Sequence, residues 1–108
     1  MKNLKNKKVL ITGSARGIGR QIAIEFAKYG SDIIISDLDK SYIEKNNFQD
    51  IKEFGVSCFS YHLDVTNYNE IIKVREEILK DVGSIDILVN NAGVVFGGGF
   101  FRCVHWKT

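Results

Sequence analysis

The sequence has no proline, two cysteines, two histidines and little excess charge. Its 15 basic and 13 acidic side chains leave a formal net charge of +2, too balanced for a nucleic-acid-binding or membrane-surface protein. The apolar run 9–11 is too short for a signal-peptide core or a membrane span. Cys58 and Cys103 lack metal-ligand spacing, so we expect reduced thiols in a cytoplasmic protein.

A glycine-rich segment, TGSARGIG at residues 12–19, is the most informative part of the chain. It follows a strand predicted at 9–11 and precedes a helix whose apolar face we expect to hold Ile18, Ile22 and Phe26. Glycines in such a turn let the backbone approach a pyrophosphate, and the helix N-terminus offers N–H groups to it. The spacing differs from the common G-x-G-x-x-G fingerprint, and glycines used only for turning and close packing are the alternative.

An aspartate at the end of the second predicted strand has the position of a ribose ligand. The strand 32–36 contains three consecutive isoleucines, which suits a parallel strand covered on both faces. Asp37 follows it, near the acidic position about 20 residues beyond the glycines that bonds ribose hydroxyls. A carboxylate there accepts from the 2′- and 3′-hydroxyls of NAD and repels the 2′-phosphate of NADP. A simple turn aspartate is the alternative.

The rest of the chain alternates helices and strands. Right-handed crossovers then predict an α/β fold, a Rossmann-type doubly wound parallel sheet of strand order 3-2-1-4. Its cofactor crevice lies at the carboxyl ends of the first and fourth strands. The remaining expected elements are a helix at 41–54, a strand at 56–63, a helix that begins at Thr66 or Asn67 and ends at Gly83, and a strand at 85–89.

Four motifs in this order resemble the short-chain dehydrogenase/reductase family. They are the glycine segment, Asp37, the pair Asp64-Val65 after the third strand, and NNAG at 90–93. The resemblance spans about residues 7–95 and implies hydride transfer between NAD(P) and an alcohol or carbonyl. It also implies that Asp64 accepts from the adenine amino group, that the Val65 backbone reads the ring edge, and that NNAG lines the ribose side. For Asp64, a charge that complements a helix N-terminus is the alternative.

Arg16 bears on the choice of cofactor. In relatives that prefer NADP, a basic residue at this place often meets the 2′-phosphate; the alternative is that Arg16 faces solvent. We expect NAD, with NADP as the alternative, because a carboxylate at Asp37 is costly beside a phosphate without a cation. The predicted cofactor-binding residues are Gly13, Ser14, Ala15, Arg16, Gly17, Ile18, Gly19, Asp37, Asp64, Val65, Asn90, Ala92 and Gly93.

The family's catalytic residues have no counterpart in this sequence. The family uses a serine, a tyrosine followed four residues later by lysine, and an assisting asparagine, but none of the four tyrosines has that lysine. We predict no catalytic or metal-binding residue and give the isolated His62 no role. We therefore expect the cofactor half of an oxidoreductase, inactive alone. A non-catalytic dinucleotide-binding module and a truncated gene product are alternatives, and a methyltransferase suits NNAG less well.

The last residues depart from this pattern. We predict a cofactor-binding segment at 1–95 and an irregular tail at 96–108, which contains Cys103 and His105 and lacks any helical or strand period. The fourth strand would be a bare apolar edge, and such edges pair with other chains. We expect association through that edge, a nicotinamide dinucleotide as ligand, and neither a nucleic acid nor a membrane as partner.

Overall fold

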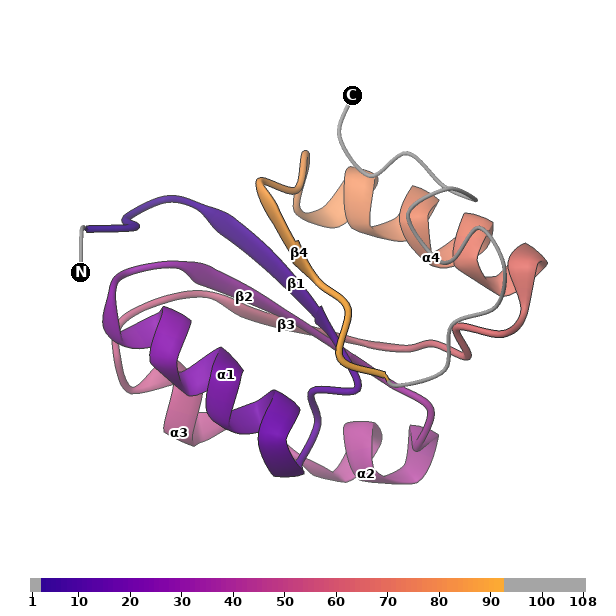
Figure 1. The fold of residues 1–108 in the computed structure, drawn as a ribbon, viewed down its shortest axis with the longest axis horizontal. Helices are drawn as coiled ribbons and strands as arrows, with labels where there is room; N and C mark the ends of the chain where they lie inside the picture. The colour runs from indigo at the N-terminus through magenta and orange to yellow at the C-terminus, as the bar shows by residue number, and fades with distance from the viewer. Residues whose placement is uncertain (1–2, 93–108) are drawn as a thin grey trace.

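The protein is a parallel four-stranded sheet with helices on both faces (Figure 1), and the computed structural model describes residues 3–92. The strand order is β3-β2-β1-β4, so the predicted fold class is confirmed. The predicted tail at 96–108 and its boundary at residue 95 lie outside the described residues. The elements are β1 (Lys8–Thr12), α1 (Gly17–Lys28), β2 (Asp32–Asp37), α2 (Lys40–Lys45), α3 (Gln49–Lys52), β3 (Cys58–His62), α4 (Tyr68–Asp81) and β4 (Ile87–Val89).

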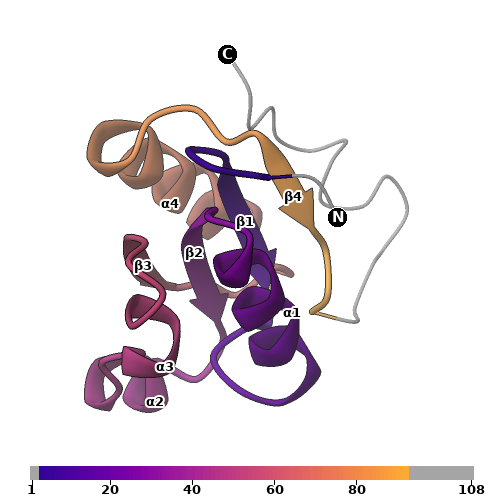
Figure 2. The same cartoon turned by 90° about the vertical axis from the view of Figure 1, so that its left-hand side faces the viewer.

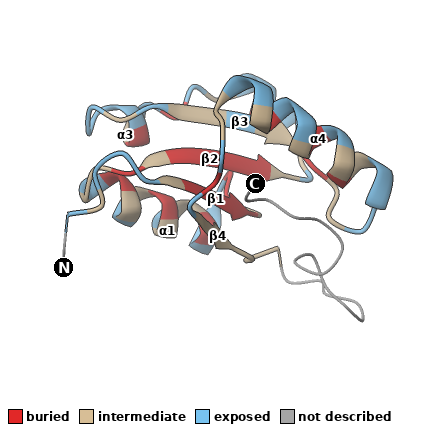
Figure 3. Ribbon diagram, turned by 90° about the horizontal axis from the view of Figure 1, so that it is seen from above, coloured by how far each residue is buried: buried red, intermediate tan, exposed pale blue. Residues whose placement is uncertain are grey.

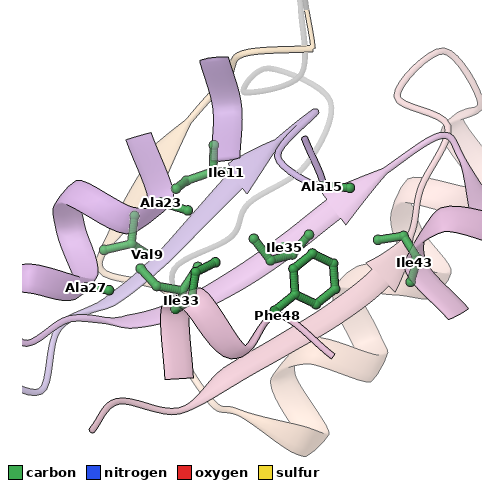
Figure 4. Packing of buried hydrophobic residues seen from close by; sticks show 10 residues of the cluster. Val9, Ile11, Ala15, Ala23, Ala27, Ile33, Ile35, Ile43 and Phe48 are labelled. Carbon is green, nitrogen blue, oxygen red and sulfur yellow. The ribbon is translucent and has the colours of Figure 1, made fainter. Parts of the chain in front are cut away.

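The two central strands are buried on both faces. Figure 2 shows α1, α2 and α3 on one side of the sheet and α4 on the other. Because side chains alternate along a strand, Val9 and Ile33 pack toward α1 and α3, while Leu10 and Ile34 pack toward α4. Buried residues accordingly run along β1 and β2 (Figure 3), and the α1-side cluster is drawn in Figure 4. The consecutive isoleucines therefore reflect burial on two faces, as the sequence predicted.

The first helix packs on the sheet through small residues. Gly19, Ala23 and Ala27 are its buried positions, and their spacing of four brings the helix backbone close to β1 and β2. Ile22 and Phe26 are partly buried against the same cluster. Ile18 is 77% exposed, so its expected place on the apolar face was wrong. It is the second residue of α1 and borders an open hollow beside this helix, whereas Ile22 and Phe26 lie further along it.

The single helix predicted at 41–54 is also wrong, because the chain breaks between α2 and α3. Asn46 is extended, and its Oδ1 accepts from the N–H of Phe48 at 3.0 Å. Asparagine side chains compete in this way with helical backbone bonds. Phe48 adopts a left-handed conformation (φ +54°) and is nearly fully buried. The break therefore exchanges helix continuity for burial of an aromatic ring.

The second half of the sheet is shorter than predicted. β3 and β4 have five and three residues, because pairing covers only Cys58–His62 and Ile87–Val89. Of the two predicted caps, Asn67 caps α4: its side chain accepts from the N–H of Glu70. Among the described strands, β4 pairs with β1 alone. No helix in residues 3–92 has the length and hydropathy needed to cross a membrane.

Burial makes Cys58 a poor nucleophile. Desolvation raises the pKa of its thiol to about 11, and no disulfide involves it in the described part of the chain. In a Cys103→Ser variant, we expect thiol labelling of Cys58 at about pH 8 to be roughly two orders of magnitude slower in the folded chain than in denaturant. Equal labelling rates in the two conditions would show that the thiol is not desolvated.

Candidate cofactor site

The hydroxyl of Thr12 joins the ends of β1 and β4. It is fully buried and donates to Asn90 Oδ1 at 3.1 Å. It accepts from the N–H groups of Asn91 at 2.9 Å and of Ala92 at 3.1 Å. The hydroxyl therefore uses its one donor and both acceptor sites. This fixes the segment after β4 against the start of the glycine loop, so three residues of the NNAG motif meet TGSARGIG.

The glycines of the loop serve two different purposes. A Cβ on Gly19 would lie 2.2 Å from the carbonyl oxygen of Gly13 and 2.7 Å from Asn91 Nδ2, so this position has no room for a side chain. Gly17 has open space around it but adopts φ +66°, which disfavours other residues. Asn91 Nδ2 donates to the Gly13 carbonyl at 3.1 Å, which holds the loop against the segment after β4. The close-packing alternative therefore applies to Gly19.

Ser14 and Ala15 tie the loop to β2. The Ser14 hydroxyl is fully buried, donates to the Ile11 carbonyl at 2.6 Å and accepts from the N–H of Ser36 at 3.2 Å. The N–H of Ala15 donates to Asp37 Oδ2 at 3.0 Å. Ser14 thus directs its side chain into the protein, and its N–H also bonds inward, to the Ser36 carbonyl at 3.0 Å, so Ser14 positions the loop.

The N-terminus of α1 differs from those of α2 and α4. Asp39 and Asn67 cap α2 and α4 with their side chains, and α4 has the acidic Glu70 in its first turn. α1 has neither a side-chain cap nor an acidic residue in its first turn. Its first N–H groups and the positive end of its dipole are therefore left for an external anion.

Asp37 lies at the carboxyl end of β2, between the glycine loop and α2. Oδ2 accepts from Ala15, and Oδ1 accepts from the N–H of Asp39 at 3.1 Å. Since a carboxylate offers about four acceptor sites, each oxygen keeps about one for a further donor. The next side chain, Leu38, is 64% exposed and gives apolar surface beside the carboxylate. Sequence reasoning overlooked Leu38, although its position after Asp37 was a signal.

Arg16 does not simply face solvent. Its Nη2 lies 3.1 Å from Asp39 Oδ2, and its guanidinium carbon lies 5.3 Å from the centre of the Tyr42 ring. Its side chain is nevertheless 62% exposed. A hollow of about 750 Å³ beside α1 has Arg16, Ile18 and Tyr42 in its wall. The guanidinium thus has a partner in the protein and room to leave it.

Arg20 is a second residue that sequence reasoning missed. Its five N–H groups reach both carboxylate oxygens of Asp50, the Ala15 carbonyl, the Tyr42 hydroxyl and Asn46 Oδ1. The hydrogen bond to Asp50 raises the pKa of Arg20 above its ordinary value and outweighs the effect of burial. Arg20 therefore connects the glycine loop to the broken α2–α3 segment, a connection that no local spacing indicates.

Asp64 and Val65 follow β3 next to the end of β2. The N–H of Leu63 donates to the Asp37 carbonyl at 2.8 Å, which brings this turn to the same edge of the sheet. Asp64 Oδ1 accepts from the hydroxyl and the N–H of Thr66, and these bonds lower the pKa of Asp64. Val65 is half-buried against the α4-side cluster.

His62, at the end of β3, lies beside the first turn of α4. His62 Nδ1 lies 3.4 Å from Glu70 Oε1, which also accepts from the N–H of Asp64. Within residues 3–92, no three His, Cys, Asp or Glu side chains gather as metal ligands would. Gly93, Cys103 and His105 lie outside the described residues.

The sequence comparison decides the family. Residues 7–104 match the short chain dehydrogenase family. The chain belongs to the short-chain dehydrogenases. Epidermal retinol dehydrogenase 2 of Mus musculus is 35% identical to it over 103 residues, which are 94% of this chain and 33% of that protein. This short-chain dehydrogenase sequence thus spans about a third of the length of that curated relative.

Solved structures agree with this family assignment. The crystal structure of NAD⁺-bound xylitol dehydrogenase aligns with a TM-score of 0.78 and 34% identity, covering 86% of this chain and 35% of that one. L-sorbose reductase from Gluconobacter frateurii, solved with NADPH and L-sorbose, aligns with a TM-score of 0.77 and 35% identity, covering 87% and 36%. The two related structures contain different nicotinamide cofactors, so the family alone does not select one.

The role of Thr12 can be tested with a matched pair of variants. Thr12→Val removes the hydroxyl and leaves the N–H groups of Asn91 and Ala92 without their acceptor, so we expect unfolding free energy to fall by about 2 kcal/mol or more. Thr12→Ser keeps the hydroxyl and should retain most of that stability. Urea denaturation measures both, and a loss for Thr12→Val no larger than that for Thr12→Ser would show that the hydroxyl does not have this anchoring role.

Proposed function

We propose that this chain binds NAD at the carboxyl ends of β1, β2 and β4, as the cofactor-holding part of a short-chain dehydrogenase that transfers hydride. The observation that carries the proposal is the fixed position of Asp37. Its carboxylate is held by the N–H groups of Ala15 and Asp39 and keeps acceptor sites for two further donors. The 2′- and 3′-hydroxyls of an adenosine ribose are such a pair of donors.

The residues of the glycine loop fit a dinucleotide. The uncapped N-terminus of α1 suits a pyrophosphate, and Gly13, Gly17 and Gly19 bring no side chain between it and the backbone. Arg16 and Ile18 flank this approach, while Ser14 and Ala15 keep the loop in place. Bound NAD would supply the hydride acceptor. The chain's own residues would bind and orient it.

The two ends of the cofactor would meet different segments. We propose that Asp64 accepts from the adenine amino group and that the Val65 backbone lies along the ring edge. Asp64 is an ionised acceptor at neutral pH, and its lowered pKa extends the ionised form to more acidic conditions. Asn90, Ala92 and Gly93 would line the ribose on the nicotinamide side, in the segment that Thr12 holds against the glycine loop.

We further propose that this chain alone does not turn over substrate. No tyrosine in it has a lysine four residues later, so the proton donor and acceptor used by the family have no counterpart. A non-catalytic dinucleotide-binding module is the second candidate function, and the same observation favours it. Turnover on addition of a family C-terminal half would support the oxidoreductase part, whereas binding without turnover would support the module.

Cofactor binding is tested by the thermal unfolding of the full chain with and without dinucleotide. NAD at a hundredfold over its Kd should stabilise the folded state by about 2.7 kcal/mol, which raises Tm by roughly 10 °C or more for a chain of this size. Asp37→Asn replaces an ionic acceptor and should weaken NAD binding about tenfold or more. Because the amide also loses one of the two backbone N–H bonds that Asp37 accepts, each chain's shift with NAD is measured from its own Tm without ligand. No shift with NAD for the parent would contradict the proposal.

Self-association through β4 is a separate proposal. Asp86 donates its N–H to the Lys8 carbonyl at 2.9 Å. Because N–H groups alternate in direction along a strand, those of Ile87 and Val89 point away from β1. Among the described strands nothing pairs with that side. An apolar strand edge with unpaired N–H groups favours pairing with a second copy.

Sedimentation velocity over a range of concentrations tests this association. We expect the parent chain to form larger species as concentration rises. Val89→Pro removes an outward N–H at nearly constant side-chain volume and should shift the equilibrium toward monomer, provided that circular dichroism shows an unchanged fold. A parent chain that stays monomeric at every concentration would exclude association through this edge.

A further inference from the structure

Arg16, Asp37 and Asp39 belong to one closed ring of contacts. The carboxylate of Asp37 binds the N–H of Ala15, directly before Arg16, and the N–H of Asp39. The side chains of Arg16 and Asp39 then pair with each other at 3.1 Å. The cation that could meet a 2′-phosphate and the carboxylate proposed to bind ribose are therefore held in one arrangement, with Asp39 as the link between them.

Asp39 divides its two oxygens between two tasks. Oδ1 accepts from the N–H of Tyr42 at 3.0 Å and caps α2, while Oδ2 takes the Arg16 guanidinium. The cap bond to the Tyr42 N–H thus fixes the orientation of the Asp39 carboxylate independently of Arg16. Tyr42, in the first turn of α2, places its ring under the same guanidinium at 5.3 Å. Arg16 is consequently held on two sides by the start of α2.

This arrangement has a direct consequence for a 2′-phosphate. Arg16 pairs with Asp39 through Nη2, so binding that phosphate through the same group, or turning the guanidinium fully toward it, costs the interaction with Asp39. Asp39 would then remain as a second unpaired carboxylate near Asp37 and the phosphate. A cofactor with a plain 2′-hydroxyl requires none of these changes.

We propose that Asp39 is a specificity-determining residue: by pairing with Arg16 it withholds this cation from the 2′-phosphate of NADP and so favours NAD. This inference rests on the proposed function, because it assigns cofactor selectivity to the same site. Asp37 discriminates by repelling the phosphate, whereas Asp39 discriminates by occupying the residue that could neutralise it. The two effects are separable by mutation.

Asp39→Asn tests the proposal with little other disturbance. The variant keeps Oδ1 for the α2 cap and replaces the oxygen that pairs with Arg16 by an N–H₂ group, which cannot accept from a guanidinium. Titration of the full chain with NAD and with NADP should give a Kd for NADP about fivefold lower than that of the parent. The Kd for NAD should stay within about twofold. The melting temperature without ligand should be close to that of the parent.

Two controls separate release of Arg16 from simple loss of negative charge. Glu44→Gln removes one charge from an exposed position of the same helix and should leave the NAD-to-NADP ratio unchanged. In an Arg16→Gln background, Asp39→Asn should improve NADP binding clearly less, because it removes only the repulsion by Asp39 and releases no cation. Repeating the cycle in an Asp37→Asn background lowers the repulsion of the phosphate and keeps NADP binding measurable.

The outcomes distinguish failure of the Asp39 inference from failure of the proposed function. An improvement that becomes clearly smaller with Arg16→Gln supports the proposal. An equal improvement with and without Arg16, or an unchanged ratio in the Asp37→Asn background, overturns it and leaves NAD binding intact. If the parent chain binds neither dinucleotide, the proposed function itself is wrong and this inference falls with it.

Discussion

Burial of β1 and β2 on both faces is the constraint on which the rest of the structure depends. Residues 9–11 and 33–35 are fully covered by α1 and α3 on one side and by α4 on the other. Polar side chains are costly inside such a layer, so they collect where the strands end. Thr12 and Asp37 mark two of those ends, and the proposed cofactor contacts lie at or just beyond the ends of the strands.

The edge of the sheet is organised by hydrogen bonds that satisfy backbone groups of the loops. Thr12 accepts from two N–H groups after β4, and Asp37 accepts from two N–H groups of neighbouring segments. Arg20 donates to the Ala15 carbonyl. Each bond uses a side chain from one element to fix a loop from another. A site held in this way is arranged before a ligand arrives, so binding costs less conformational entropy.

Local signals predicted the fold well. The isoleucine run, the glycine spacing and the strand-end aspartate each depend on a few adjacent residues, and the strand order follows from right-handed crossovers. Predictions that depended on distant partners were weaker. At the break between α2 and α3, Arg20 donates to Asn46, and the Phe48 side chain is buried. Neither contact is visible in the periodicity of 41–54.

The sequence by itself determined the alternation of strands and helices, the glycine loop and the positions of Asp37 and NNAG, because burial pattern and backbone conformation are properties of neighbouring residues. Only the tertiary structure decided which polar groups pair. Arg16 with Asp39, Arg20 with Asp50, and Thr12 with the segment after β4 are between 23 and 80 residues apart. Thr12 and Arg16 meet their partners because parallel strands bring their carboxyl ends to one edge, whatever their separation in the chain. Arg20 meets Asp50 because α1 and α3 pack against each other.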